Sequence, residues 1–323
     1  MDPLPDTCWL ITGGAGFIGH HLLRTLLEQN QQVRVVDDFS TGLRSRLEPF
    51  KGRFELLEGS IVDPEVCAQA CRGITHILHQ AAIPSVARSV DDPEATHAAC
   101  ATGTLNLLNA ARKAGVSRVV YAGSSSAYGN TPELPKRVEM PTNPLSPYAV
   151  AKLAGEHYVR AFTEVFDMEG VTLRYFNVFG PGQDPESFYA AVIPKFVTLA
   201  LAGEAPTIHG DGEQTRDFTY IDNVVDANLR AAMAPAEAVN GRTFNVGCGD
   251  RISVNRLWTE IREHTGAQVD AEHGPARPGD VRDSLADVAP LTEATGWTPS
   301  VDLREGLGRT VAWYEGALDE ARV

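Results

Sequence analysis

Short apolar runs alternate with longer amphipathic stretches along the first half of the chain. The short runs are typical of buried parallel strands, and the longer stretches have the apolar spacing of helices that pack on a sheet. We predict strands at 9–12, 33–36, 54–57, 74–79, 119–122 and 171–175, and helices at 17–27, 64–71, 94–114 and 148–166. This alternation predicts the α/β fold class, with a doubly wound, Rossmann-type parallel sheet whose strands end at one edge.

The pattern changes in the second half of the chain. After residue 176 the predicted strands and helices become shorter, and glycine and proline become more frequent. We predict a first domain over residues 1–176, to which residues 219–247 return, and a smaller α/β lobe over residues 177–323. The sequence draws no clean boundary between the two.

A glycine-rich turn, from Gly13 to Gly19, directly follows the first predicted strand and opens a helix. Glycine is needed in such a turn because a pyrophosphate must reach the backbone N–H groups at the start of the helix. The next strand ends in Asp37 and Asp38. A carboxylate there accepts hydrogen bonds from the adenosine ribose and repels a 2′-phosphate, which favours NAD over NADP. We therefore predict that the first domain binds a dinucleotide.

A hydroxyl cluster, Ser124-Ser125-Ser126, follows the predicted strand at 119–122. A proline-rich excursion then leads to Tyr148 and Lys152, which lie one turn apart on one face of the next helix. An ammonium near a phenol lowers the phenol's pKa from about 10, so the tyrosine can exchange a proton near neutral pH. A Tyr-x-x-x-Lys pair alone is common on helix surfaces. Here the pair follows a strand that ends in serine, in a chain that also has the glycine turn, and this combination favours a catalytic role for Tyr148 and Lys152.

Composition and charge narrow the choice of partners. The 43% hydrophobic and 22% charged residues are typical of a soluble globular protein, and no apolar run is long enough to cross a membrane. A net charge of −14 disfavours nucleic acid and anionic membranes as partners. The first six residues do not form an export signal, so we expect a cytoplasmic protein. Of the five cysteines, only Cys67 and Cys71 lie one helical turn apart in the sequence, and no second such pair could complete a metal site. We therefore predict reduced thiols and no metal site.

Two arginines stand beside glycines and acids in the second half of the chain. Arg216 follows a Gly-Asp-Gly segment, and Arg277 opens the segment Arg-Pro-Gly-Asp. Guanidinium groups in turns suit diphosphate recognition. Surface salt bridges would explain both arginines equally well.

In combination these motifs resemble the extended short-chain dehydrogenase/reductase family, and within it the UDP-hexose 4-epimerases. The resemblance runs from Gly13 to about Trp313 and includes the segment Arg174-Tyr175-Phe176-Asn177. It implies reversible 4-epimerisation of a UDP-hexose through a transient 4-keto intermediate, with tightly bound NAD. Tyr148 would be the base on the sugar 4-hydroxyl, and Ser124 would hydrogen-bond the same oxygen. Lys152 would bind the nicotinamide ribose and help to keep the phenol acidic.

The resemblance also implies two sets of binding residues. The cofactor set is Gly13, Gly16, Phe17, Ile18, Gly19, Asp37, Asp38, Ser40, Thr41, Gly42, Ser60, Ile61, Gln80, Ala81, Ala82, Tyr148, Lys152 and Tyr175. The substrate set is Ser85, Ser124, Ser125, Ser126, Tyr148, Asn177, Gln183, Ala191, Val192, Phe196, Arg216, Arg277, Asp280 and Ser284. Ser60 and Cys100 depart from the family pattern, which has Asp and Asn at these positions, and we expect them to loosen or alter NAD binding.

The same resemblance bears on the substrate. Ser125 and Ser126 stand where dehydratases have an acid pair, and the segment Gly182-Gln183-Asp184 has no arginine for a sugar carboxylate. Both observations favour a neutral hexose. Ser284 stands where a bulky aromatic residue is found in enzymes restricted to glucose and galactose, and its small side chain leaves room for an N-acetyl group. The prediction is UDP-N-acetylglucosamine and UDP-N-acetylgalactosamine, with UDP-glucose and UDP-galactose not excluded.

Alternatives remain. They are a UDP-glucuronate 4-epimerase, another NAD-dependent nucleotide-sugar enzyme (dehydratase, decarboxylase or oxidoreductase), and a non-catalytic dinucleotide sensor on the same fold. The helices that start near Glu94 and Pro147 carry more apolar surface than one sheet face needs. With the resemblance, this predicts a homodimer formed through a four-helix bundle.

Overall fold

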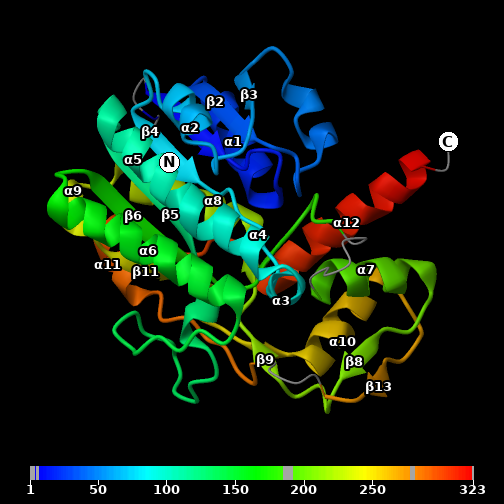
Figure 1. Cartoon of the computed structure of the whole chain (residues 1–323). Coiled ribbons are helices and arrows are strands. Elements are labelled where there is room, and N and C mark those ends of the chain that lie inside the picture. The colour runs from blue at the N-terminus through cyan, green and yellow to red at the C-terminus, as the bar shows by residue number, and fades with distance from the viewer. Residues whose placement is uncertain (1–3, 5–6, 185–191, 277–280, 322–323) are drawn as a thin grey trace.

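A seven-stranded parallel sheet forms the centre of the computed structural model, which describes residues 4, 7–184, 192–276 and 281–321 (Figure 1). The strand order is β11-β6-β5-β4-β1-β2-β3, and every neighbouring pair is parallel. The strands are β1 (Cys8–Thr12), β2 (Gln32–Asp37), β3 (Glu55–Glu58), β4 (His76–His79), β5 (Arg118–Ser124), β6 (Glu169–Tyr175) and β11 (Thr243–Val246). The chain runs outward from β1 to β3, returns to β4 and continues in the other direction. The predicted doubly wound fold is therefore confirmed.

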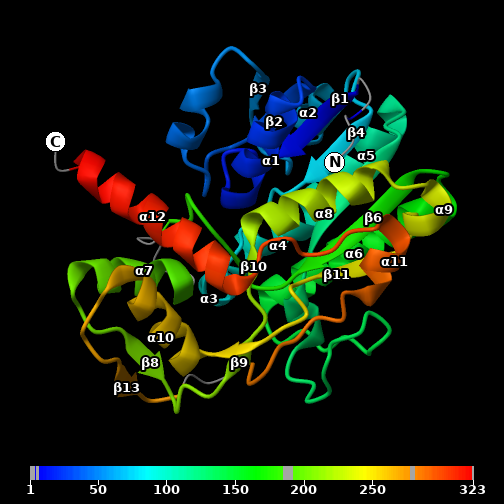
Figure 2. The ribbon, with the colours of Figure 1, turned by 180° about the vertical axis from the view of Figure 1, so that it is seen from behind.

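Helices cover both faces of this sheet. On one face lie α2 (Pro64–Ala70), α5 (Gly103–Ala114) and α6 (Pro147–Val165), in the foreground of Figure 1. On the other lie α1 (Phe17–Glu28) and α8 (Ile221–Met233), which Figure 2 shows from behind. Successive strand residues point to opposite faces, so Ile11 packs in the core on the α1 side and Leu10 in the core on the α5 side. Burial on both faces explains why the strands read as continuous apolar runs.

The predicted helix at 94–114 is interrupted. It consists of α4 (Pro93–His97), a π-helical turn over Ala98–Thr102, and α5. The short α3 (Val86–Asp91) precedes it. Such π-helical turns insert a residue into a helix and are frequent at functional sites. Here the turn contains Cys100 and packs against α6.

The smaller lobe combines helices with short strand pairs. Its helices are α7 (Val192–Ala202), α10 (Val254–Thr265) and α12 (Leu303–Ala321). The strand pairs are β7 (Val178–Phe179) with β10 (Thr219–Tyr220), β8 (Thr207–His209) with β13 (Glu272–Gly274), and β9 (Thr215–Arg216) with β12 (Ile252–Ser253). Two further short helices of the described residues, α9 (Ala236–Val239) and α11 (Ala289–Thr295), contact strands β6 and β11 of the central sheet. Single 3₁₀ turns lie at Arg44–Arg46, Glu48–Phe50 and Ser125–Tyr128. The domain boundary at residue 176 stays a prediction.

No helix in the described part of the chain combines the length and apolarity that a membrane span requires.

Candidate active site

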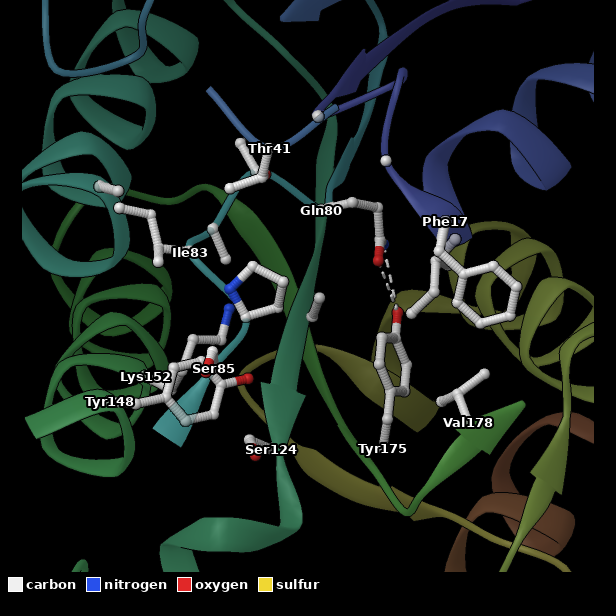
Figure 3. A pocket seen from close by; sticks show the side chains of 18 of the residues that line it. Phe17, Thr41, Gln80, Ile83, Ser85, Ser124, Tyr148, Lys152, Tyr175 and Val178 are labelled. Atoms are coloured by element: carbon white, nitrogen blue, oxygen red, sulfur yellow. Dashed lines mark hydrogen bonds between the residues drawn. The ribbon is translucent and has the colours of Figure 1, made fainter. Parts of the chain in front are cut away.

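A cavity of about 700 Å³ follows the carboxyl edge of the sheet from the glycine turn to the smaller lobe (Figure 3). It brings together most of the residues that the sequence predicted for the site. The predicted residues that line it are Gly13, Gly16, Phe17, Ile18, Gly19, Asp37, Asp38, Ser40, Thr41, Ser60, Ile61, Gln80, Ala81, Ala82, Ser85, Ser124, Ser125, Ser126, Tyr148, Lys152, Tyr175, Asn177, Gln183, Arg216 and Ser284. Residues that directly follow β1, β4, β5 and β6 are among them, as expected when parallel strands end at one edge.

The glycine turn is packed too tightly for side chains. A Cβ at Gly13, whose φ is +70°, would lie 2.8 Å from the Cα of Ala81, and a Cβ at Gly19 would overlap the carbonyl oxygen of Gly13. No side chain caps the start of α1, where Gly16 is the N-cap residue. The first N–H groups of the helix therefore have no side-chain acceptor. This cradle fits the diphosphate of a dinucleotide.

Asp37 and Asp38 behave differently although they are neighbours. Asp37 is nearly buried, and its carboxylate accepts hydrogen bonds from the N–H groups of Ala15 and Phe39, both at 2.8 Å. It therefore supports the glycine turn, and burial raises its pKa. Burial also tends to raise the pKa of Asp38, but hydrogen bonds from Ser40 and Ser60 outweigh this effect and lower it. Ser60 thus hydrogen-bonds an acid of the predicted ribose site; its effect on NAD affinity stays a prediction.

Gly42 does not line the cavity. A Cβ on it would lie 2.7 Å from the Cβ of Ala15, so Gly42 packs behind the glycine turn. Its predicted contact with the cofactor stays a prediction.

Tyr148, Ser124 and Lys152 meet in the middle of the cavity (Figure 3). Ser146 caps α6 by accepting a hydrogen bond from the N–H of Ala149 at 3.1 Å, and Pro147 opens the helix, so Tyr148 lies in its first turn. Ser124 ends β5, and its hydroxyl hydrogen-bonds the hydroxyl of Ser126 at 2.7 Å. Strand and helix thus place a phenol, a hydroxyl and an ammonium around one space.

The expected lowering of the Tyr148 pKa is not a property of the chain alone. Burial raises the pKa of Tyr148, nearby Cys100 adds to the rise, and only the hydrogen bond from Ser124 opposes it. Burial also lowers the pKa of Lys152 to about 8. Lys152 does not contribute to this shift, and the expected help from Lys152 together with bound NAD stays a prediction.

A second hydrogen-bonded group faces Tyr148 across the cavity. Tyr175 donates to the side-chain oxygen of Asn228 at 2.9 Å and accepts from the side-chain amide of Gln80 at 3.2 Å (Figure 3). Asn228 lies on α8, far along the chain. The sequence analysis missed it because its role depends on how α8 packs under the sheet edge.

The smaller lobe closes the far end of the cavity. Asn177, with a φ of +24°, donates to the carbonyl oxygen of Asp217 at 2.8 Å and to the hydroxyl of Ser284 at 3.4 Å. Asp217 accepts three backbone N–H groups in turn, and burial raises its pKa to about 6. Asn177 and Ser284 are thus held by one buried network.

Two predicted substrate residues lie elsewhere. Phe196 is buried in the core, edge-on to Trp258 with ring centroids 5.7 Å apart, and it does not line the cavity. Val192 opens α7 and does not line it either. The helical spacing of α7 makes Phe196 part of its buried face. Ala191, Arg277 and Asp280 lie outside the described residues.

Besides Arg88, two cations that the sequence analysis did not single out line the cavity, Arg46 and Lys136. Arg46 donates to the carbonyl oxygens of Ala15 at 3.1 Å and Gly182 at 2.7 Å, so it joins the glycine turn to the loop that carries Gln183. Lys136 is buried, and its ammonium donates to the backbone and hydroxyl oxygens of Thr131. Neither belongs to a recognisable motif, so no sequence signal pointed to them.

The sequence pattern that defines the NAD dependent epimerase/dehydratase family matches residues 9–247. A UDP-glucose 4-epimerase from Mycolicibacterium smegmatis is 40% identical over 309 residues, which are 94% of this chain and 97% of that protein. A UDP-N-acetylglucosamine 4-epimerase from Methanobrevibacter ruminantium, solved with UDP-N-acetylmuramic acid, has a TM-score of 0.92 at 34% identity, over 97% of this chain and 100% of its own. A UDP-glucose 4-epimerase from Thermus thermophilus, solved with NAD, has a TM-score of 0.88 at 34% identity, over 96% and 99%.

Proposed function

Because the chain belongs to the NAD dependent epimerase/dehydratase family, we propose that it is a UDP-hexose 4-epimerase that keeps its cofactor bound during turnover. The family and NAD as its cofactor agree with the predictions from the sequence. One observation carries the proposal: Ser124, Tyr148 and Lys152 share a cavity with the glycine turn.

In this proposal the chain's own residues divide the chemistry. Tyr148 accepts the proton of the sugar 4-hydroxyl as the hydrogen on C4 leaves as hydride, and it returns the proton when hydride is delivered to the other face of the 4-keto sugar. Ser124 hydrogen-bonds the reacting oxygen, and Lys152 binds the nicotinamide ribose. The glycine turn, Asp37 and Asp38 hold the dinucleotide. When bound, NAD would supply the hydride acceptor and a positive charge that favours the phenolate form of Tyr148.

The proposed substrates are UDP-N-acetylglucosamine and UDP-N-acetylgalactosamine, with UDP-glucose and UDP-galactose accepted as well. Ser284 supports the larger sugars because a small side chain at this point of the cavity wall leaves space beside C2. Ser125 and Ser126, which also line the cavity, support epimerisation over dehydration because neither is an acid. Of the residues proposed to hold the diphosphate and uridine, Asn177 and Arg216 lie in the described part of the chain, and both line the cavity.

A substrate panel tests the proposal. Purified protein is incubated with UDP-N-acetylglucosamine, UDP-glucose or UDP-glucuronate, with and without added NAD, and the products are separated. We expect galacto isomers from the first two sugars without added NAD. Stoichiometric NADH would instead indicate net oxidation, and a product from UDP-glucuronate alone would favour the acidic-sugar alternative. No isomer from any of the three sugars would refute the proposal.

We also propose a homodimer formed by α4–α5 and α6. Val150 and Tyr158 on α6 support it, since they are 52% and 37% exposed although apolar. Val90, 66% exposed, lies on the adjacent α3. A cluster of this kind is typical of a subunit contact. Sedimentation that detects only monomers at micromolar concentration would contradict the dimer.

A further inference from the structure

Tyr121 touches Lys152 twice. It lies on β5, three residues before Ser124, and is fully buried on the side of the strand that faces α6. Its hydroxyl donates to the carbonyl oxygen of Lys152 at 3.0 Å. The Nζ of Lys152 lies over its ring, 4.3 Å from the centroid. One side chain therefore contacts both the backbone and the ammonium of Lys152.

Gly155 makes this approach possible. It lies three residues after Lys152 on α6. A Cβ on it would overlap the Tyr121 hydroxyl and lie 2.6 Å from the ring carbon Cζ. A glycine inside a helix costs about 0.5–1 kcal/mol relative to alanine. The close packing of Tyr121 against α6 is a specific reason for glycine at this position.

The surroundings of Lys152 offer no stronger partner for its charge. From β4, His79 lies beside Tyr121 with ring centroids 5.4 Å apart, and its two ring nitrogens bond the hydroxyls of Thr12 and Thr104 at 2.7 and 2.9 Å. Burial, with a contribution from Lys152, lowers the pKa of His79 to about 3, so it is neutral.

The remaining titratable groups around Lys152 are also occupied or neutral. From the π-helical turn, burial raises the pKa of Cys100, and from α6 burial raises the pKa of Tyr148. Glu156, also on α6, is paired with Arg174 of β6 at 2.6 and 2.9 Å. In the described part of the chain no carboxylate forms an ion pair with Lys152. The face of the Tyr121 ring therefore contacts an ammonium that has no carboxylate partner among the described residues.

We propose that Tyr121 is a positioning residue for Lys152: its ring face stabilises the buried ammonium, and its hydroxyl fixes the helical turn that carries it. An ammonium over an aromatic ring is attracted by the negative ring face, and the attraction increases when water is excluded. The proposal rests on the role given to Lys152 under Proposed function, since a charged Lys152 matters only if that residue binds the cofactor.

The pKa of Lys152 is the property that separates this role from simple packing. Burial already lowers it to about 8. A negative ring face under an ammonium favours the charged form and so opposes the effect of burial. Loss of the ring would therefore lower the pKa further. Loss of the hydroxyl alone would leave it nearly unchanged, because the hydroxyl bonds a backbone carbonyl and not the ammonium.

The experiment is an NMR titration of protein labelled with [ε-¹³C]lysine, in which the Cε shift reports the charge of each lysine. The chain has only Lys51, Lys113, Lys136, Lys152 and Lys195, and a Lys152→Arg variant assigns the signal. We expect Tyr121→Leu to lower the pKa of Lys152 by about one unit and Tyr121→Phe to leave it within about 0.3 unit. If Tyr121→Leu does not fold, Tyr121→Met and Gly155→Ala, which displaces the ring, serve the same purpose.

An unchanged pKa of Lys152 in a folded variant without the ring contact would overturn the proposal, as would equal shifts in the Leu and Phe variants. The titration needs no turnover, so it can succeed even if the protein epimerises none of the UDP-sugars. If it does epimerise them, the alkaline limb of the kcat profile should move to lower pH in Tyr121→Leu and not in Tyr121→Phe.

Discussion

The side chain of Ser124 interacts with the phenol of Tyr148 and opposes the rise in its pKa, although a proline-rich excursion separates the end of β5 from the start of α6. The contact gives the buried phenol a polar partner of its own. It also defines where a sugar hydroxyl would lie, since it must reach both groups.

Replacing Tyr148 with phenylalanine should reduce turnover at least ~10²-fold, because a general base is lost. Sugar binding should stay nearly unchanged, since the ring is kept. Initial rates with UDP-N-acetylglucosamine and a binding titration measure the two effects. Tyr158→Phe, on the exposed face of the same helix, is the matched control and should retain activity. Turnover near wild type in Tyr148→Phe would mean that another group is the base.

Replacing Ser284 with tyrosine should fill the space proposed for the N-acetyl group. We expect kcat/KM for UDP-N-acetylglucosamine to fall by about 10²-fold and that for UDP-glucose to change much less. Ser284→Ala keeps the space and removes only the hydroxyl, so both substrates should still react. Parallel losses for the two sugars in Ser284→Tyr would contradict a role in selecting the C2 substituent.

Replacing Gly19 with alanine should abolish retention of NAD, because the new Cβ would overlap the carbonyl oxygen of Gly13 and distort the turn. The measurement is the NAD content of the purified protein after acid release. Gly316→Ala is the control, since a Cβ there meets no atom within 4 Å and alanine favours a helix. Equal NAD content in the two variants would show that the turn tolerates a side chain.

The stability of the protein should fall as pH decreases below about 6.5. Burial lowers the pKa of His20 to about 4 and those of His21 and His79 to about 3. Between its folded and unfolded pKa, each histidine binds a proton in the unfolded chain and not in the folded chain. Each therefore lowers the free energy of unfolding by up to ~1.4 kcal/mol for each unit that the pH falls below the unfolded pKa.

Urea unfolding between pH 7.5 and pH 5 measures the slope of the free energy of unfolding against pH. The slope should decrease in His79→Gln, because one of the buried neutral histidines is removed. A free energy of unfolding that is constant over this range would contradict neutral buried histidines.

Local pattern was sufficient for the sheet and for the cofactor half of the site. Apolar runs such as 9–12 and 119–122 fix buried strands, and parallel strands bring Gly13, Gln80 and Ser124 to one edge wherever the rest of the chain goes. The glycine turn could be recognised in the sequence because its packing leaves no room for a Cβ at Gly13 and Gly19.

Contacts between distant elements could not be predicted in this way. The π-helical turn at Ala98–Thr102 keeps helical spacing on both sides, so the apolar pattern continues through it. Phe196 has the residue type of a nucleoside-binding side chain, but its place on α7 turns it into the core. The direction of the Tyr148 pKa shift depends on how completely α6 and β5 exclude water, which no local pattern records.

Arg46 connects the two ends of the cavity by hydrogen bonds to both. Its guanidinium ties the turn proposed to receive the dinucleotide to the loop that carries Gln183, and Tyr314 of α12 hydrogen-bonds the same loop from the other side. His21 of α1 bonds the carbonyl oxygen of Pro181 in this loop at 2.9 Å, so two side chains couple the cofactor end to the sugar end. In the proposed reaction, such connections would hold the dinucleotide and the sugar at a fixed spacing while the sugar ring presents its two faces in turn.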